Sequence, residues 1–187
     1  MGIFLRMYLL IGPSAHHSQW EIIMSHLLAY WKIYWDEMRE RDYHIDRFQA
    51  LKERKQEIEQ NGWGAKEEIL WQQIKVGENL WVVGREKPNS KRWSLLLRLN
   101  VQKKIEDLQN GYRYRLLSKD FDFFDPENQP NLETILKKMK FKTGKSIPED
   151  IAGGIIGKLI QNRRPLTLND NDLLMGWVEK HKLSVIQ

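Results

Sequence analysis

The sequence predicts an all-α protein, mainly a helical bundle of about six or seven helices with at most one or two short strands. Three observations lead to this prediction. Apolar residues recur at helical spacing in several segments, Ser18 and Glu21 form a capping box before the first of them, and turns rich in Asn, Gly and Pro separate them. With 41% hydrophobic residues, a chain of 187 residues can bury a core, and one domain or two small ones is usual at this length.

The first half of the chain predicts three helices. Residues 18–42 carry a wide apolar stripe rich in tryptophan, which favours a long helix buried on more than one side. A more polar helix over 45–60 ends at Asn61-Gly62. Residues 65–83 fit a third helix, although its end at Trp81-Val82-Val83 fits a short strand as well.

A fourth helix is predicted over 90–110, followed by an extended segment over 112–117. The apolar residues that would form its buried face are Trp93, Leu96, Leu97, Val101, Ile105 and Leu108. Residues 118–131 hold two prolines and four acidic residues, so we expect a loop without a regular element, tethered by its phenylalanines.

The last third predicts three more helices, over 131–140, over 146–162 and after a cap at Thr167 or Asn169. The expected organisation is an N-terminal helical region 1–117, the acidic and aromatic loop 118–131, and a C-terminal helical region 132–187 packed on the first as one domain. The predicted core comprises Trp20, Ile23, Leu27, Trp31, Trp93, Leu96, Leu97, Val101, Leu108, Ile155, Leu159, Leu174 and Trp177.

Composition excludes several classes of function. There are no cysteines, which excludes disulfide scaffolds, thiol nucleophiles and cysteine-ligated metal centres. The apolar run 3–11 is interrupted by Arg6 and is too short for a membrane span, so we expect a cytoplasmic protein without a membrane partner. No phosphate-binding loop, dinucleotide fingerprint or nucleophile elbow is present, and we expect no catalysis and no cofactor.

Two further motifs favour structural interpretations over functional ones. Gly154 and Gly157 match the GxxG pattern of KH domains, but two isoleucines lie between them, which favours close helix packing. The oxygen donors of Asp120, Asp122 and Asp125, with Glu127, could hold a metal ion, yet their spacing does not match an EF-hand. A solvated acidic loop without metal is the expectation.

The distribution of charge is the main functional signal. Residues 85–115 carry nine basic and three acidic residues, a net charge of +6, and residues 137–164 carry eight basic and two acidic residues, also +6. Between them, residues 119–134 have a net charge of −4. Basic helix faces suit contact with phosphates, and alternating tyrosine and arginine over 112–115 suits stacking on unpaired bases. The candidate nucleic-acid-binding residues are Lys91, Arg98, Lys103, Lys104, Tyr112, Arg113, Tyr114, Arg115, Lys142 and Lys145.

The basic segment 90–110 and the C-terminal segments 151–160 and 173–178 give the chain a general resemblance to the helical small subunit of CRISPR effector complexes. The resemblance implies a non-catalytic, nucleic-acid-binding subunit of an antiviral ribonucleoprotein assembly, with RNA or single-stranded DNA and other protein subunits as partners. The first alternative is a protein–protein adaptor or inhibitor that docks through the aromatic segment 18–42. The second is a small metal-dependent nuclease at residues 120–127.

Overall fold

The fold is a mixed α/β architecture, not the predicted helical bundle. The computed structural model describes residues 26–31, 47–65, 68–85, 92–109, 111–126, 128–149, 153–160 and 165–187. Within these residues the chain forms, in order, β1 (Leu27–Trp31), α2 (Arg47–Asn61), β2 (Trp63–Ala65), α3 (Glu68–Gln73), β3 (Asn79–Arg85), β4 (Trp93–Asn100), β5 (Lys103–Gln109), β6 (Tyr112–Leu117), β7 (Phe121–Phe123), α4 (Glu133–Lys138), α5 (Gly153–Ile160) and α6 (Leu168–His181). Helix and strand content are about equal, so the all-α prediction and the helical-bundle description are both wrong.

The strands form two sheets. Sheet A has the order β1-β3-β4-β7, in which β1 and β3 are parallel and the other pairs antiparallel. Sheet B has the order β2-β6-β5 and is antiparallel throughout. The register of β3 against β4 shifts between Val82 and Val83, so Leu96 is the extra residue of a bulge.

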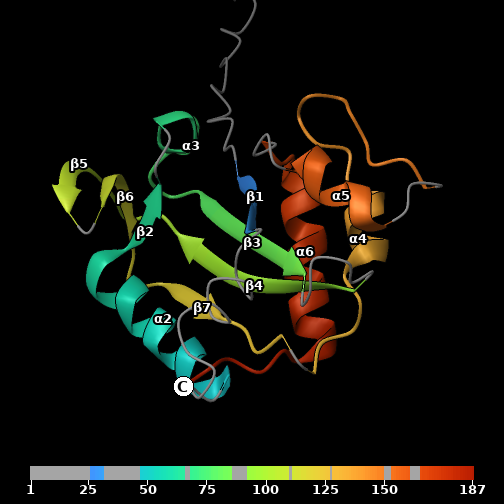
Figure 1. Cartoon of the computed structure of the whole chain (residues 1–187). Coiled ribbons are helices and arrows are strands. Elements are labelled where there is room, and N and C mark those ends of the chain that lie inside the picture. The colour runs from blue at the N-terminus through green and yellow to red at the C-terminus, as the bar shows by residue number, and fades with distance from the viewer. Residues whose placement is uncertain are drawn as a thin grey trace, which may run out of the picture.

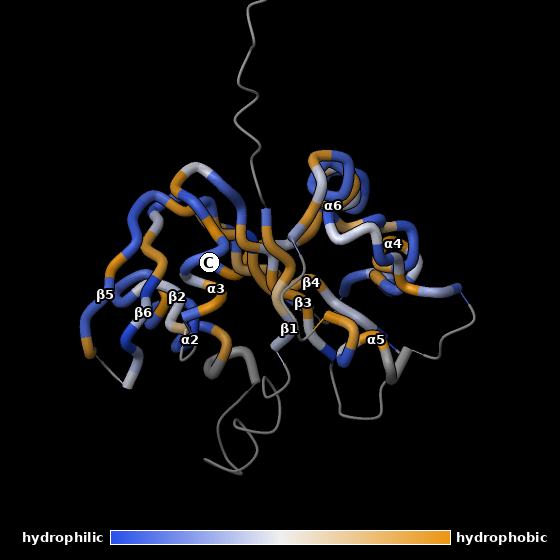
Figure 2. The backbone as a smooth tube through the Cα atoms, turned by 90° about the horizontal axis from the view of Figure 1, so that it is seen from above, coloured by the Kyte–Doolittle hydropathy of each residue, from blue (hydrophilic) through white to orange (hydrophobic). Residues whose placement is uncertain are grey.

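Sheet A lies between two layers, as Figures 1 and 2 show from two directions. One, the helical layer, consists of α4, α5 and α6. The other, the hairpin layer, consists of α2, α3 and sheet B. Successive residues of β3 supply the two cores in turn: Leu80 and Val82 belong to the core under the hairpin layer, and Trp81 and Val83 to the core under the helical layer. Both faces are therefore buried, which is why the strand is apolar at nearly every position.

This double burial explains the wrong helix predictions. Residues 95–97 and 99 are all buried in β4 because both faces of the strand are covered, and such a continuous apolar run also satisfies helical spacing by chance. The predicted helix 90–110 is β4 and β5 joined by a turn at 101–102, and Leu108, assigned to its core, is 83% exposed on β5. The predicted helix 18–42 contains β1 and, just before it, the described residue His26; its other residues lie outside the described ones.

Other elements match the sequence prediction more closely. Helices α2, α4, α5 and α6 lie within the ranges predicted for them, residues 112–117 are extended, and the alternative of a strand at 81–83 is confirmed within β3. Thr167 caps α6 through a capping box with Asp170. The loop 118–131 does contain a regular element, because β7 pairs with β4 over three residues.

The end of the chain closes one edge of sheet A. Asp125 donates its backbone N–H to Ser184 O, and Ile186 donates to Phe123 O, so residues 184–186 run along β7. Ile186 then enters the core of the hairpin layer, and Figure 1 places the C-terminus beside α2. No helix in the described part of the chain combines the length and apolar character that crossing a membrane requires.

Candidate nucleic-acid interface

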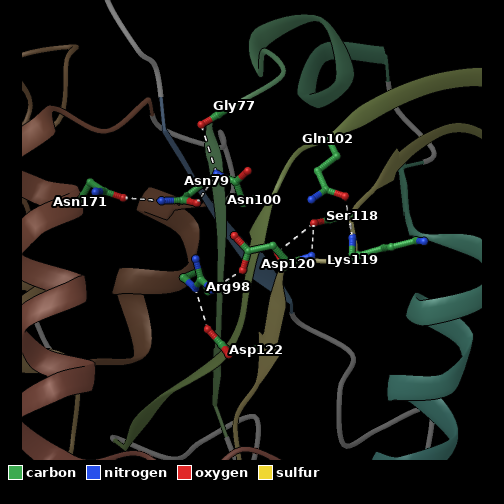
Figure 3. Close-up of polar contacts among 10 residues, drawn as sticks. All are labelled: Gly77, Asn79, Arg98, Asn100, Gln102, Ser118, Lys119, Asp120, Asp122 and Asn171. Atoms are coloured by element: carbon green, nitrogen blue, oxygen red, sulfur yellow. Dashed lines mark hydrogen bonds and ion pairs between the residues drawn. The ribbon is translucent and has the colours of Figure 1, made fainter.

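Arg98 projects from β4 into a pair of acidic residues. Its Nε donates to Asp122 Oδ2 at 2.6 Å and its Nη2 to Asp120 Oδ1 at 2.7 Å, and only 17% of the side chain is exposed (Figure 3). Asp122 is also the backbone neighbour of Arg98 in the β4–β7 register. The acidic loop thus neutralises this arginine, which leaves it little capacity for a phosphate.

The arginines of the β5–β6 hairpin are held in the same way. Arg113 donates to Glu106 Oε1 at 2.7 Å. Arg115 donates to both carboxylate oxygens of Asp107 and to Asn61 O at the end of α2, and its side chain is 7% exposed. Arg115 therefore anchors the hairpin to α2 rather than offering its charge to solvent.

Lys104 is likewise engaged within the hairpin layer. Its Nζ donates to Ile74 O at 2.8 Å and lies 4.3 Å from the centre of the Trp71 ring. Burial lowers the pKa of Lys104, and the nearby carboxylate of Glu78 partly opposes that shift. This lysine joins β5 to the segment that follows α3.

The two tyrosines of the predicted stacking platform pack inward. Tyr114 is 6% exposed and its ring lies 5.5 Å from that of Trp71. Tyr112 is half-buried over Gly64, where an added Cβ would come within 2.4 Å of the tyrosine Cγ. Their packing against Trp71 and Gly64 holds the hairpin layer together and leaves their faces little room for a base.

The remaining candidate residues are spread over the molecule. Lys103 is exposed on β5, and Lys91 lies outside the described residues. Lys142 and Lys145 follow α4, and the Lys142 N–H donates to Pro165 O. Since the core of the helical layer contains Phe141, this loop lies on the opposite side of sheet A from the hairpin. The structure therefore separates the two basic stretches that the sequence suggested as one footprint.

A groove of about 540 Å³ lies between α4 and α6 on the helical layer. Its lining combines apolar residues with a polar and charged rim, and consists of Pro130, Asn131, Thr134, Ile135, Lys138, Asn169, Asp172, Leu173, Gly176, Trp177, Lys180 and His181. This volume falls in the roughly 300–1,000 Å³ range typical of ligand sites. All of the groove's lining residues belong to the described part of the chain.

Local hydrogen bonds fix the two helices that form the groove. The buried Asp170 carboxylate accepts from the backbone N–H groups of Lys140, Phe141 and Thr167 at 2.9–3.0 Å, which ties the end of α4 to the start of α6. Asn171 accepts from Trp81 Nε1 at 2.9 Å and from Asn79 Nδ2 at 3.2 Å, which attaches α6 to β3 (Figure 3 draws the bond from Asn79). The walls of the groove are thus held by contacts made below it.

Gly176 keeps the groove open. An added Cβ at this position would meet no atom within 4 Å, so packing does not require a glycine here. A glycine inside a helix costs roughly 1 kcal/mol relative to alanine. Beside it, Trp177 is 5% exposed and its ring lies 5.2 Å from that of His181.

The lysines at the groove have no acidic partner among the residues that the structure describes. Lys138 and Lys180 are exposed, and neither forms an ion pair with any described residue. The same holds for Lys140 and Lys182 on the adjoining segments, while Asp172 is the one acid in the groove lining. Because α4 ends beside the start of α6, Lys138 and Lys180 lie near opposite ends of the groove, about 15 Å apart along α6 at 1.5 Å per residue.

No local pattern in the sequence indicates this groove. Lys138 was counted within the basic stretch 137–164, but nothing in the sequence alone showed that α4 and α6 lie side by side. A weak signal was present in Gly176, a glycine inside an otherwise regular helical pattern without an evident packing reason.

Two other motifs have structural roles. Gly157 packs α5 onto sheet A, since an added Cβ would lie 2.9 Å from Tyr30 Cε1 and 3.4 Å from Trp93. This contact confirms the helix-packing interpretation of the GxxG pattern at that glycine. Asp120 and Asp122 bind Arg98, and within the described residues no three histidine, aspartate or glutamate side chains are grouped as metal ligands would be. Glu127 lies outside those residues.

Comparison with known proteins adds no relative: no family model, no curated protein and no solved structure matches this chain. The resemblance to CRISPR small subunits rested on two segments of the sequence. The first of these, residues 90–110, contains the strands β4 and β5 in its described part, whereas the second contains the helices α5 and α6. Any assignment of function therefore depends on the site itself.

Proposed function

We propose that this protein binds single-stranded nucleic acid, RNA or DNA, at the α4–α6 groove and serves as a non-catalytic subunit of a larger ribonucleoprotein assembly. The observation that carries the proposal is the contrast in charge pairing. The arginines of the hairpin and of β4 are bound to acidic residues, whereas the groove lysines Lys138 and Lys180 have no ion-pair partner among the described residues.

The groove has the two components that such binding requires. Phosphates are held by cations, each of which releases condensed counterions, and Lys138 and Lys180 present such cations near the two ends of the groove. Unpaired bases are held by apolar and aromatic surfaces that accept any base. Ile135 and Leu173, both partly exposed, supply apolar lining above the buried Trp177, and Gly176 leaves space above it.

The lysines that follow α4 extend the positive surface. Lys140 is exposed beside the end of α6 that Asp170 caps, and Lys145 is exposed on the turn beyond it. A strand lying along the groove would meet these side chains after Lys138. The proposal keeps Lys145 from the sequence-based candidates and transfers the rest of the interface to the helical layer.

The test separates phosphate contacts from base contacts. Fluorescence anisotropy would follow the binding of labelled single-stranded RNA and DNA oligonucleotides, in separate titrations over a range of salt concentrations. We expect Lys138→Glu/Lys180→Glu to weaken binding strongly and to reduce the salt slope by about 1.4, since each phosphate contact on a single strand contributes about 0.7. Gly176→Leu should reduce affinity with little change in slope, because it fills the base site and removes no charge.

A matched control has the same change in net charge. Lys75 and Lys119 are exposed lysines on the other side of the molecule, and Lys75→Glu/Lys119→Glu should retain most of the affinity. If the control pair and the groove pair weaken binding equally, attraction is unspecific and the groove is not the site. If neither pair nor Gly176→Leu changes the affinity of a folded protein, the proposed function is wrong.

A further inference from the structure

The outer edge of β5 has no partner strand in the described part of the chain. Sheet B ends at this strand, which pairs with β6 alone among the described strands. β5 is seven residues long, and Leu108 near its end is 83% exposed. An edge of this kind presents backbone N–H and C=O groups that another strand can bind.

The order of charges on β5 is self-complementary. Two lysines, Lys103 and Lys104, precede Ile105, and two acids, Glu106 and Asp107, follow it. In an antiparallel pair of two β5 strands centred on Ile105, Lys103 faces Asp107 of the second copy. Lys104, whose ammonium also donates to Ile74 O within its own chain, faces Glu106 of the second copy. Opposite charges directly across two strands stabilise a pair, and like charges destabilise it.

Other arrangements lose this match. A parallel, in-register pair would place lysine on lysine and acid on acid. A slip by one residue sets Ile105 opposite a charged residue and turns the side chains to the other face. Lysines on an edge strand ordinarily prevent pairing with another strand. Here the antiparallel register centred on Ile105 places an acidic residue opposite each of the two lysines, and the other arrangements do not.

The acids remain available for a second partner. Glu106 and Asp107 accept from Arg113 and Arg115 of β6, yet their side chains are still 43% and 50% exposed. An ionised carboxylate has several acceptor positions, so each acid can also accept from a lysine on its other side. The β5–β6 register shifts between Glu106 and Gln109, which ends the regular part of the strand close to where the self-complementary pattern ends.

We infer that two copies of this chain associate through β5, in an antiparallel pair about a twofold axis at Ile105. Sheet B thereby becomes a six-stranded sheet that runs across the dimer. The interface is small, so the dimer forms at high protein concentration and dissociates on dilution. High salt favours the monomer because the cross-strand charges are exposed. This association is separate from the α4–α6 groove on the opposite layer.

A charge-swap experiment tests the register without nucleic acid. Sedimentation velocity across a series of concentrations should show a dimer for the parent. Lys104→Glu and Glu106→Lys should each weaken it about tenfold, since each places two like-charged pairs across the axis. The double variant Lys104→Glu/Glu106→Lys should dimerise like the parent, and an equimolar mixture of the two single variants should recover a heterodimer.

The recovery also controls for folding. Lys104 contacts Trp71, so Lys104→Glu has a local structural effect, but the double variant and the mixture contain that same substitution. Lys119→Glu, an exposed reversal outside β5, should leave the dimer intact. The inference is overturned if the parent stays monomeric at every concentration, which would leave the edge open to a strand of another protein. It is also overturned if the single reversals do not weaken the dimer, or if neither the double variant nor the mixture restores it.

Discussion

The arginines of the hairpin layer and the lysines at the groove of the helical layer differ in their ion pairing, although Lys137 elsewhere on α4 pairs with Glu133 at 2.8 Å. In the hairpin layer and the adjoining edge of sheet A, Arg98, Arg113 and Arg115 are bound to acids, and Arg115 is nearly buried. In the helical layer, Lys138 and Lys180 extend from the rim of a groove without an ion-pair partner among the described residues. Segments with a similar local charge therefore differ in whether their basic residues are paired with acids. The sequence alone does not display this difference.

The chemistry of the two side chains fits this division. The planar guanidinium of arginine binds a carboxylate through two donors, as Arg115 does with Asp107, and suits a fixed internal contact. The ammonium of lysine is a mobile point charge on a flexible stem, which suits a surface that meets a variable phosphate backbone. Substitution of a paired arginine should therefore mainly affect stability, and substitution of a groove lysine should mainly affect binding.

The largest expected effect is on the stability of the hairpin layer. Arg115→Ala removes charge-assisted hydrogen bonds to Asp107 and Asn61 together with a buried stem, and should lower the free energy of unfolding by about 2–3 kcal/mol. The loss stays below that of a fully buried pair because Asp107 is half-exposed and can be hydrated again. Urea denaturation measures the change.

The matched change in the helical layer is Lys138→Ala. This lysine forms no ion pair with any described residue, so its removal should change the free energy of unfolding by no more than about 0.5 kcal/mol. Affinity for single strands should show the reverse order, with Lys138→Ala weakened and folded Arg115→Ala close to the parent. An equal loss of stability in both variants would remove the distinction between the layers.

An intermediate effect on stability is expected at two glycines inside helices of the helical layer. Gly176→Ala should stabilise the protein by about 1 kcal/mol, because helix propensity improves and the new Cβ meets open space. Gly157→Ala gains the same propensity, but its Cβ would lie 2.9 Å from Tyr30 and 3.4 Å from Trp93, and overpacking costs typically 1–3 kcal/mol. We expect Gly157→Ala to be neutral or destabilised by up to about 2 kcal/mol.

Thermal unfolding of both variants provides the measurement. Opposite shifts would show that Gly157 serves packing while Gly176 serves the open groove. If Gly176→Ala is destabilised, α6 has a constraint at the groove floor other than space, and the role given to that glycine is wrong.

Local sequence signals predicted only part of this fold. The cap predicted at Thr167 or Asn169 located the start of α6, and the turn at Asn61-Gly62 located the end of α2, since both depend on neighbouring residues alone. Residues 93–100 were misassigned because a strand covered on both faces loses the alternation that marks a half-buried strand. Nothing local to β4 shows that two layers cover it.

The candidate site was harder to predict because it depends on pairing across the chain. In the sequence, Arg98, Arg113 and Arg115 cannot be distinguished from the lysines of 137–145. In the structure, these arginines are hydrogen-bonded to Asp122, Glu106 and Asp107. The groove required α4 and α6, more than thirty residues apart, to lie side by side, which Asp170 and Asn171 bring about through long-range hydrogen bonds. Spacing along the sequence contains no trace of these contacts.

The smallest expected effect is a pH dependence where the helical layer meets sheet A. His26 is 3% exposed just before β1; its Nδ1 accepts from the Asn79 N–H, and its carbonyl accepts from Leu166 just before α6. Burial lowers its pKa below the usual 6.5; Glu78 and Asp172 raise it and Lys142 lowers it further, and the net shift is downward. The folded protein therefore holds a neutral imidazole at a pH where the unfolded chain already binds a proton.

The sign of the effect follows from that difference. Stability from His26 is complete above about pH 6.5, the value of the unfolded chain, and is lost as the pH falls below it towards the lower pKa of the folded state. Urea denaturation at pH 7.5 and 5.5 should show a decrease for the parent that is smaller in His26→Gln, which has no titrating group and retains an acceptor. The carboxylates of Glu78 and Asp172 oppose the downward shift of the His26 pKa and so reduce this difference. If parent and variant lose stability equally between these pH values, His26 is not the group that links the helical layer to pH.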